Sequence, residues 1–122
     1  MDLAARLRHL GFPIAYLGFP YLTRSVSLVL AEPAYLYQIF KRLYPDVARE
    51  FRTTPACVER DLRTLIRIYW SSGGAGTLRR ISPYPLTRRP TVSELLALLT
   101  GPYGYNWPDP KQCSGSAANT SV

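Results

Sequence analysis

The sequence predicts an all-α domain of about six helices around one core, containing a helix-turn-helix. Hydrophobic residues make up 47% of the 122 residues, which suits one folded domain with a modest core. Apolar residues recur at helical spacing in successive segments, and proline, glycine and serine separate these segments. No long stretch alternates apolar and polar residues, as a half-buried strand would.

Three helices are expected before the central pair. The first is expected over residues 2–10, and Gly11 would end it. A loop rich in glycine, proline and aromatic residues follows, and the second helix is expected over about residues 21–31. Pro33 breaks that helix and can open a third, over about residues 33–41. Their expected apolar positions are Leu3, Leu7, Leu10, Leu22, Val26, Val29, Leu30, Leu36, Ile39 and Phe40.

The segment from Leu43 to Trp70 predicts a helix, a tight turn and a second helix. Thr54 is expected to cap the second helix, because its hydroxyl can accept a free backbone N–H, and Pro55 falls at its first position. Stepping about 100° per residue places one apolar face on this helix, formed by Val58, Leu62, Leu65, Ile66 and Tyr69. The opposite face is cationic and hydrogen-bonding, and comprises Arg60, Arg63, Thr64, Arg67 and Ser71, with Cys57 and Glu59 at its edges.

The helix before it carries a short apolar stripe, formed by Val47, Ala48 and Phe51. Arg52 and Thr53 occupy the turn, where many helix-turn-helix units carry glycine. The spacing indicates a helix-turn-helix whose second helix can enter a DNA major groove. The alternative is a pair of ordinary packed helices with solvated outer faces.

The segments after Trp70 predict a short turn of helix and one last helix. A flexible helix end is expected at residues 71–74, and residues 77–81 can add a turn. A proline-rich basic loop follows, and Thr91 or Ser93 is expected to cap a helix over residues 92–100. The apolar stripe of this helix is Leu95, Leu96, Leu98 and Leu99.

Domain organisation follows from where the helical pattern ends. Residues 1–101 are expected to form the helix-turn-helix domain. Residues 102–122 lose the pattern and are expected to form an irregular to disordered tail.

Charge favours a polyanionic partner. Fifteen Lys and Arg residues against eight Asp and Glu give a net charge of +7 and a pI near 9.8, and nucleic acid is the commonest partner of such a chain. An anionic membrane surface is the rival, but no polybasic block lies beside an apolar anchor. No apolar run is long enough for a membrane span, which favours a cytoplasmic protein.

Enzyme chemistry is not expected from these residues. No Ser-His-Asp set, paired-carboxylate motif or phosphate-cradling glycine loop is recognisable, and His9 is the single histidine. No Cys, Asp or Glu cluster stands near His9 at ligand spacing, so no metal or cofactor is expected. Cys57 and Cys113 lie in different contexts, so a reducing cytosol is a simpler reading than a disulfide.

Four segments carry a resemblance to a known family. They are LGFPIAYLGFPYL (Leu10–Leu22), LYPDVAREFRTTPACVER (Leu43–Arg60), Trp70 with the small residues after it, and RPTVSELLALL (Arg89–Leu99). In order and spacing they resemble the C-terminal effector domain of the sporulation response regulator called stage 0 sporulation protein A. The resemblance implies a DNA-binding domain that recognises a TGTCGAA-like box, often in tandem copies, and activates or represses transcription.

The resemblance also implies which side chains read bases. The matching positions are Cys57, Glu59, Arg60, Arg63 and Thr64. Arginine can bond guanine O6 and N7 bidentately, and glutamate can accept from a cytosine amine. The family usually has a basic residue where Cys57 stands and a histidine where Thr64 stands. The operator is therefore expected to differ from the family's, or the affinity to be lower.

Phosphate contacts are expected from basic and hydroxyl side chains around this helix. The candidates are Arg52, Thr53, Thr54, Arg67, Arg79, Arg80, Arg88 and Arg89. For the last four, solvated loop charge is the alternative, and a salt-dependence measurement separates the two.

The family protein also carries an N-terminal receiver domain, which has no counterpart in these 122 residues. The chain is either an excised domain or a short protein made only of the effector module, in which phosphorylation cannot act in the usual way. Double-stranded DNA in the bacterial nucleoid is the expected partner, and RNA polymerase is a further candidate.

A second copy on tandem boxes is also expected, because one half-site seldom gives enough specificity. Much of the leucine stripe of residues 92–100 must be core, so its edge and the aromatic segment 103–107 are the expected contact between copies that are monomeric in free solution. The alternative function is a protein-interaction module that kept the fold and lost the operator. Its motivation is the pair of departures at Cys57 and Thr64, together with the aromatic residues Tyr16, Phe19, Tyr103, Tyr105 and Trp107.

Overall fold

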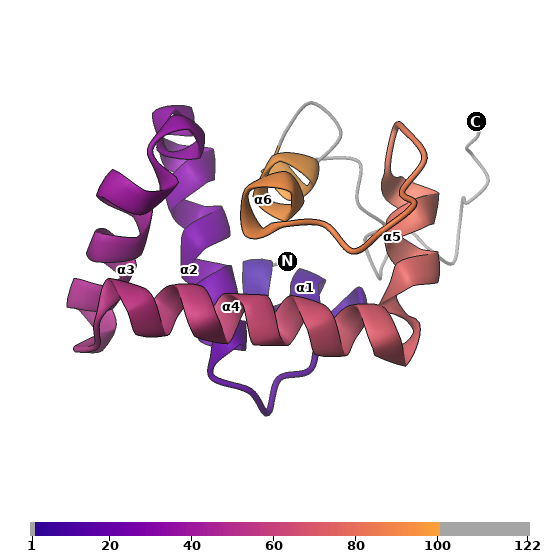
Figure 1. Cartoon of the computed structure of the whole chain (residues 1–122), viewed down its shortest axis with the longest axis horizontal. Coiled ribbons are helices and arrows are strands. Elements are labelled where there is room, and N and C mark those ends of the chain that lie inside the picture. The colour runs from indigo at the N-terminus through magenta and orange to yellow at the C-terminus, as the bar shows by residue number, and fades with distance from the viewer. Residues whose placement is uncertain (1, 101–122) are drawn as a thin grey trace.

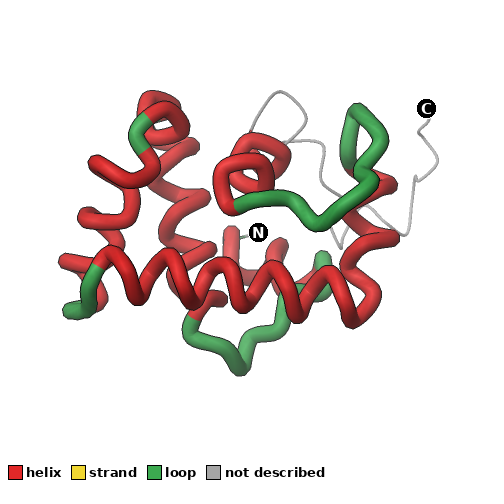
Figure 2. Tube along the Cα trace, in the orientation of Figure 1, coloured by secondary structure: helices red, strands yellow, loops and turns green. Residues whose placement is uncertain are grey.

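The computed structural model describes residues 2–100, and this part of the chain is helical without a strand (Figures 1 and 2). Its α-helices are α1 (Leu3–His9), α2 (Gly18–Ala31), α3 (Tyr44–Phe51), α4 (Pro55–Tyr69), α5 (Ala75–Ile81) and α6 (Val92–Thr100). A 3₁₀ turn, η1 (Pro33–Tyr37), and two π turns, η2 (Ile39–Leu43) and η3 (Trp70–Gly74), join them. The predicted all-α class is confirmed.

The long helix α4 is the element against which the others are arranged. In Figure 1 it runs horizontally across the lower part of the view, and α2 and α3 stand over its N-terminal half. Helices α2, α3 and α6 all pack against it, because its apolar stripe is continuous from Val58 to Tyr69. Four of the five predicted stripe residues are at most 1% exposed, and the fifth, Ile66, is 3% exposed. Burial of this stripe fixes which face of α4 is turned outward.

Two contacts fix α4 against the rest of the domain. Gly18, at the start of α2, lies so close to the middle of α4 that a Cβ there would overlap the backbone carbonyl oxygen of Asp61. At the C-terminal end of α4, the Tyr69 hydroxyl donates to the Leu10 carbonyl at 2.7 Å, and its ring stacks on Phe12 at a centroid distance of 3.8 Å. The N-terminal segment is thereby attached to the C-terminal turn of α4.

The sequence prediction of one helix over residues 33–41 is wrong. The 3₁₀ turn η1 ends at Gln38, whose φ of −140° and ψ of 48° are not helical, and η2 then leads directly into α3. Tyr35 and Ile39 are buried on either side of this break. Phe40, which was expected to be apolar core, is 68% exposed.

Three smaller expectations also need correction. Helix α2 begins at Gly18 rather than near Tyr21, since Pro20 lies in its first turn, where a missing N–H costs no intrahelical bond. Leu30 is only half-buried, and Phe51 is 38% exposed.

The four leucines of α6 are buried, with exposed fractions between 0% and 6%. They pack into the core against α2 and α4, so they offer no apolar edge for contact between copies. The other expected contact, residues 103–107, lies outside the described residues. None of the helices between residues 2 and 100 combines the length and the apolarity needed to cross a membrane.

Candidate nucleic-acid interface

The turn between α3 and α4 is built by local backbone chemistry. Arg52 ends α3 in the left-handed conformation, with φ 57° and ψ 48°, and the Thr53 N–H donates to the Ala48 carbonyl at 2.9 Å. Thr54 then caps α4, because its hydroxyl accepts the backbone N–H of Cys57 at 3.1 Å. Pro55 occupies the first helical position. The predicted start of α4 is therefore confirmed, and arginine takes the place that glycine usually has.

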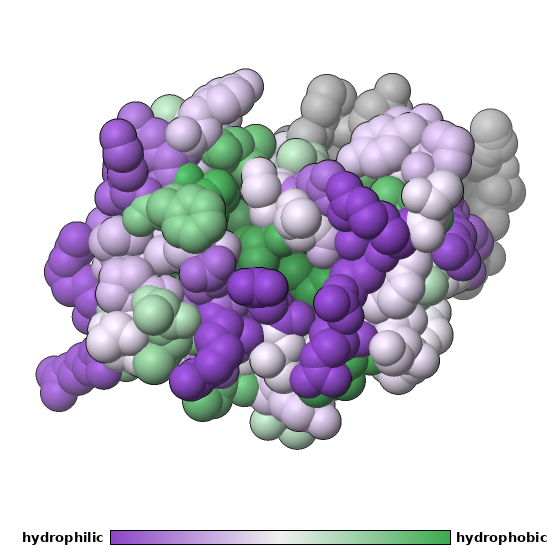
Figure 3. All heavy atoms as spheres, in the orientation of Figure 1, coloured by the Kyte–Doolittle hydropathy of each residue, from purple (hydrophilic) through white to green (hydrophobic). Residues whose placement is uncertain are grey.

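The outward face of α4 forms a cationic hollow, which we define by its lining residues. These are Ala56, Glu59, Arg60, Arg63, Thr64, Arg67 and Arg89, around a volume of about 290 Å³. Arg60, Arg63 and Arg67 are exposed on successive turns of the helix, and Thr64 is half-buried between them. Figure 3 shows hydrophilic side chains gathered over α4 and over the loop that precedes α6. The structure thus brings together three arginines of α4 and one from a distant loop.

The charges in the cationic hollow are only loosely paired. Arg63 lies 3.8 Å from the Glu59 carboxylate, and Arg60 lies 3.4 Å from Asp61, while both guanidinium groups are more than two-thirds exposed. Exposed ion pairs of this kind contribute little to stability. These arginines can therefore turn toward an anionic ligand at small cost.

Cys57 lies at the start of α4, at the edge of the same face. Hydrogen bonding with Thr54 and Thr53 lowers the pKa of its thiol, and the charge of Arg60 acts in the same direction. The side chain is half-buried. A thiol with a lowered pKa therefore stands where the resemblance leads us to expect a basic group.

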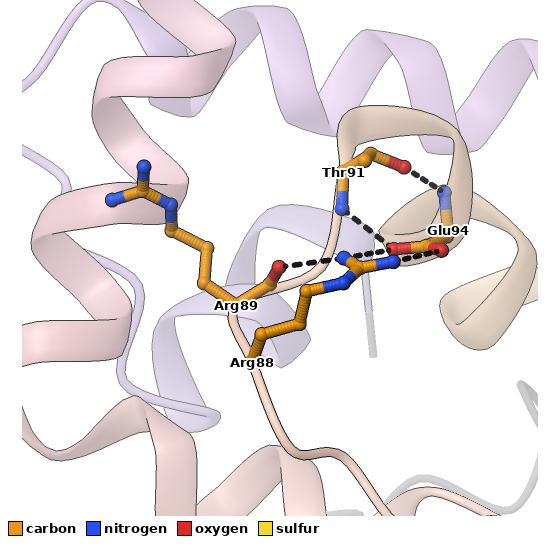
Figure 4. Close-up of polar contacts among 4 residues, drawn as sticks. All are labelled: Arg88, Arg89, Thr91 and Glu94. Atoms are coloured by element: carbon orange, nitrogen blue, oxygen red, sulfur yellow. Dashed lines mark hydrogen bonds and ion pairs between the residues drawn. The ribbon is translucent and has the colours of Figure 1, made fainter.

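Arg88 and Arg89 are neighbours in sequence but differ in surroundings (Figure 4). The Arg88 guanidinium donates to both oxygens of the Glu94 carboxylate at 3.0 Å, and also to the Arg89 carbonyl at 3.1 Å. Glu94 and Thr91 form a capping box at the start of α6, with distances of 2.9 and 3.1 Å. The Arg89 side chain points to the other side of the loop and lines the cationic hollow.

The remaining predicted phosphate ligands lie elsewhere on the described surface. Arg79 donates to the Leu86 carbonyl at 3.0 Å, and its guanidinium lies 5.1 Å from the centre of the Trp70 ring. Arg80 is exposed on α5. Neither of them lines the cationic hollow.

A larger groove opens beside the cationic hollow and shares Glu59, Arg63 and Arg89 with it. Its volume is about 1020 Å³, and Figure 3 shows hydrophobic residues at its floor, between hydrophilic ones. Its apolar lining is Leu36, Tyr37, Ile39, Phe40, Tyr44, Ile66, Trp70 and Val92. Sequence reasoning missed this groove, because η1 and η2 were expected to be one continuous helix.

A helix-turn-helix with its second helix exposed and cationic defines the class of DNA-binding domains. The family model described as sporulation initiation factor Spo0A C terminal matches residues 3–101. The chain belongs to this family, whose members are DNA-binding effector domains that regulate transcription in sporulation and are not enzymes. The resemblance seen in the sequence is therefore confirmed, and DNA is the partner of the fold.

Proposed function

We propose that this protein binds duplex DNA sequence-specifically, with α4 in the major groove of a TGTCGAA-like box. The observation that carries the proposal is the cationic hollow, in which Arg60, Arg63, Arg67 and Arg89 converge on the outward face of α4. The dimensions of a major groove admit one α-helix, and phosphate charge attracts such a surface.

The base readers are the side chains on the first half of α4. Arg60 and Arg63 suit guanine, and Glu59 suits the amine of cytosine. Cys57 and Thr64 replace longer groups of the family pattern with short ones. The preferred box therefore differs from TGTCGAA at the base pairs that these two side chains face.

Phosphate contacts flank the base readers. Arg67 and Arg89 lie at the rim of the cationic hollow, and Arg52, Thr53 and Thr54 lie at the turn that precedes α4. The N-terminus of a helix and the groups around it favour anions. Arg79 and Arg80 are the further phosphate contacts proposed from the sequence, whereas Arg88, which the sequence also suggested, is bonded to Glu94.

The test is Arg60→Ala, measured on the preferred duplex and on random duplex. The loss of a bidentate base contact costs about 1–3 kcal/mol on the preferred site and relaxes selectivity at one base pair. Arg8→Ala is the matched control, because Arg8 is an exposed arginine in the last turn of α1. Equal loss on both duplexes would make Arg60 a phosphate ligand and contradict its role as a base reader.

The proposal places the protein on the bacterial chromosome in the cytoplasm, where a second copy on a tandem box and RNA polymerase are its further partners. The buried leucines of α6 do not supply the contact between copies. Contact must therefore come from other surfaces, or from residues outside the described range.

A second candidate function is a protein-interaction module that kept the fold and lost the operator. The groove beside the cationic hollow favours it, because Tyr37 and Phe40 present exposed aromatic rings there, 88% and 68% exposed. Retention of duplex binding with no preference among sequences would favour this candidate over the first.

A further inference from the structure

The loop between α5 and α6 is fixed at several points along its length. Leu86 accepts a hydrogen bond from Arg79, and Pro90 is buried. Between these points, Thr87, Arg88 and Arg89 are exposed. The position of the Arg89 side chain therefore depends on what holds the backbone of these three residues.

The ion pair between Arg88 and Glu94 fixes the backbone of this loop. One Arg88 guanidinium bonds both carboxylate oxygens of Glu94 and the carbonyl of Arg89 (Figure 4). Glu94 is itself fixed, because its carboxylate also accepts the Thr91 N–H and its own backbone N–H is capped by the Thr91 hydroxyl. The helix that carries Glu94 is anchored in the core by its leucines.

We propose that Glu94 is a positioning residue for DNA binding, acting through Arg88 to hold Arg89 beside α4. The proposal rests on the proposed function, since it concerns the same cationic hollow. Arg88 acts as a brace, meaning that it fixes the loop backbone to Glu94, and Arg89 is the residue that contacts the phosphate. Because Glu94 neutralises the Arg88 charge at 3.0 Å, Arg88 adds little net charge to the surface, and this fits a brace better than a phosphate ligand.

The geometry of the Arg88–Glu94 ion pair suits the positioning of the loop that carries Arg89. Two parallel N–H···O bonds between a guanidinium and a carboxylate restrict orientation more than one bond does. Preorganising a loop in its bound conformation reduces the ordering cost of binding. Among residues 2–100 the Arg89 guanidinium has no hydrogen-bond or ion-pair partner, so the only polar contacts that fix its position are those of the loop backbone.

The discriminating variant is Glu94→Gln, because simple electrostatics and the proposal predict opposite signs. Removal of an acidic charge near DNA should by itself strengthen binding. The proposal predicts binding about five- to tenfold weaker, since the loss of one phosphate contact and of its preorganisation is on that scale. Glutamine still serves as the capping-box partner of Thr91, so the substitution affects the brace and leaves the helix cap in place.

Glu32→Gln is the matched control. Glu32 forms a similar two-bond pair with Arg42, at 2.8 and 3.2 Å, at the end of α2. Its loss removes the same charge from a surface that does not line the cationic hollow. Binding by this variant should equal or slightly exceed that of the unsubstituted protein.

A double-mutant cycle with Arg89→Gln separates positioning from general destabilisation. If Glu94 acts through Arg89, then Glu94→Gln has no further effect once Arg89 is removed. Arg89→Gln should also lower the slope of log affinity against log salt by about one, and Glu94→Gln should lower it similarly. Thermal melting of each variant verifies that the domain stays folded.

Unchanged or tighter binding by Glu94→Gln would overturn the proposal, as would strictly additive effects of the two substitutions. Failure of the proposed function has a different signature, since the unsubstituted protein would then show no preference among duplexes. The two failures are therefore distinguishable in one set of titrations.

Discussion

Single side chains cap the N-termini of α4 and α6, the two helices that begin next to the cationic hollow. Thr54 was predicted as a cap, and Thr91 was one of two candidates with Ser93, because a cap depends on residues within one helical turn. The structure confirms Thr54 and selects Thr91. The different surroundings of Arg88 and Arg89 were not predictable. Both lie in one basic loop, and what distinguishes them is the position of Glu94, which depends on how α6 is packed.

Cys57 allows a direct test of the interface at the residue scale. In a Cys113→Ser background, coupling a maleimide to Cys57 should weaken DNA binding by about tenfold or more, corresponding to roughly 1.4 kcal/mol. The added group would occupy the space that α4 needs in the groove. Because its pKa is lowered, Cys57 should react readily near neutral pH, and bound duplex should slow the reaction.

The control for this measurement is a variant whose only cysteine lies on α1, away from the cationic hollow. Arg8→Cys in a protein without Cys57 and Cys113 places the maleimide on α1 and should leave binding unchanged. Normal binding by the Cys57 conjugate would show that the start of α4 is not in contact with DNA.

At the scale of elements, periodicity predicted α4 well and η1 poorly. A stripe over a long helix gives many independent observations, and all five stripe residues are buried. The segment from Pro33 to Leu43 is short, and it breaks at Gln38, whose backbone angles are not helical. No proline or glycine marks this break in the local sequence, so a pattern of apolar residues could not predict it.

The turn before α4 gives one prediction at this scale. Arg52 has a φ of 57°, a region that glycine adopts without a steric penalty. Arg52→Gly should therefore raise the free energy of unfolding by roughly 0.5–1 kcal/mol, and it should weaken DNA binding through the loss of a phosphate contact. Urea denaturation and duplex titration measure the two effects.

Arg49→Gly is the control for the turn, because Arg49 is exposed inside α3. Glycine there should lower the free energy of unfolding by about 1 kcal/mol. If Arg52→Gly were destabilising to a similar extent, the left-handed turn would not be a source of strain.

Alkaline pH should destabilise the fold through buried tyrosines. Burial raises the pKa of Tyr44 and of Tyr69 to about 12, from an ordinary value of 10.0. Between pH 10 and pH 12 the unfolded chain therefore loses these protons before the folded one does. Stability is fully present below pH 10 and falls as pH rises, by up to about 1.4 kcal/mol per pH unit for each tyrosine.

Tyr44→Phe should reduce this alkaline slope, as measured by urea denaturation at a series of pH values. Tyr37→Phe should not, because Tyr37 is 88% exposed and its substitution removes no buried hydroxyl. An unchanged slope in Tyr44→Phe would mean that this hydroxyl ionises equally in both states.

At the scale of the whole molecule, the interface joins segments that are distant in sequence. The loop before α6 brings Arg89 to α4, and η1, η2 and α6 build the groove next to it. Sequence reasoning placed the arginines of α4 on one face but could not assign Arg89 to that face, since this depends on the path of the loop over the core. The edge of the α6 leucine stripe, which was expected to contact a second copy, is buried for a related reason, because the core uses the whole stripe.

We expect the free protein to be monomeric and to bind tandem boxes cooperatively, head to tail. With a net charge of +7 on each copy, association in free solution is opposed by repulsion that DNA phosphates neutralise. Sedimentation measures whether the free protein is monomeric, and titration of one-box and two-box duplexes measures whether binding is cooperative. A spacer altered by about half a helical turn, roughly five base pairs, is the control duplex.

Cooperativity should disappear on the altered spacer and return on one lengthened by a full turn. A stable dimer without DNA would contradict the prediction. So would two-box affinity equal to that of two independent one-box events.

Selection of bound molecules from a pool of random duplexes shows whether the outward face of α4 reads a DNA sequence, with the unsubstituted protein and Arg60→Ala run in parallel. We expect the unsubstituted protein to enrich one motif related to TGTCGAA, and Arg60→Ala to lose preference at one base pair of that motif. A pool that stays random with the unsubstituted protein, or a motif that Arg60→Ala leaves unchanged at every position, would contradict this expectation.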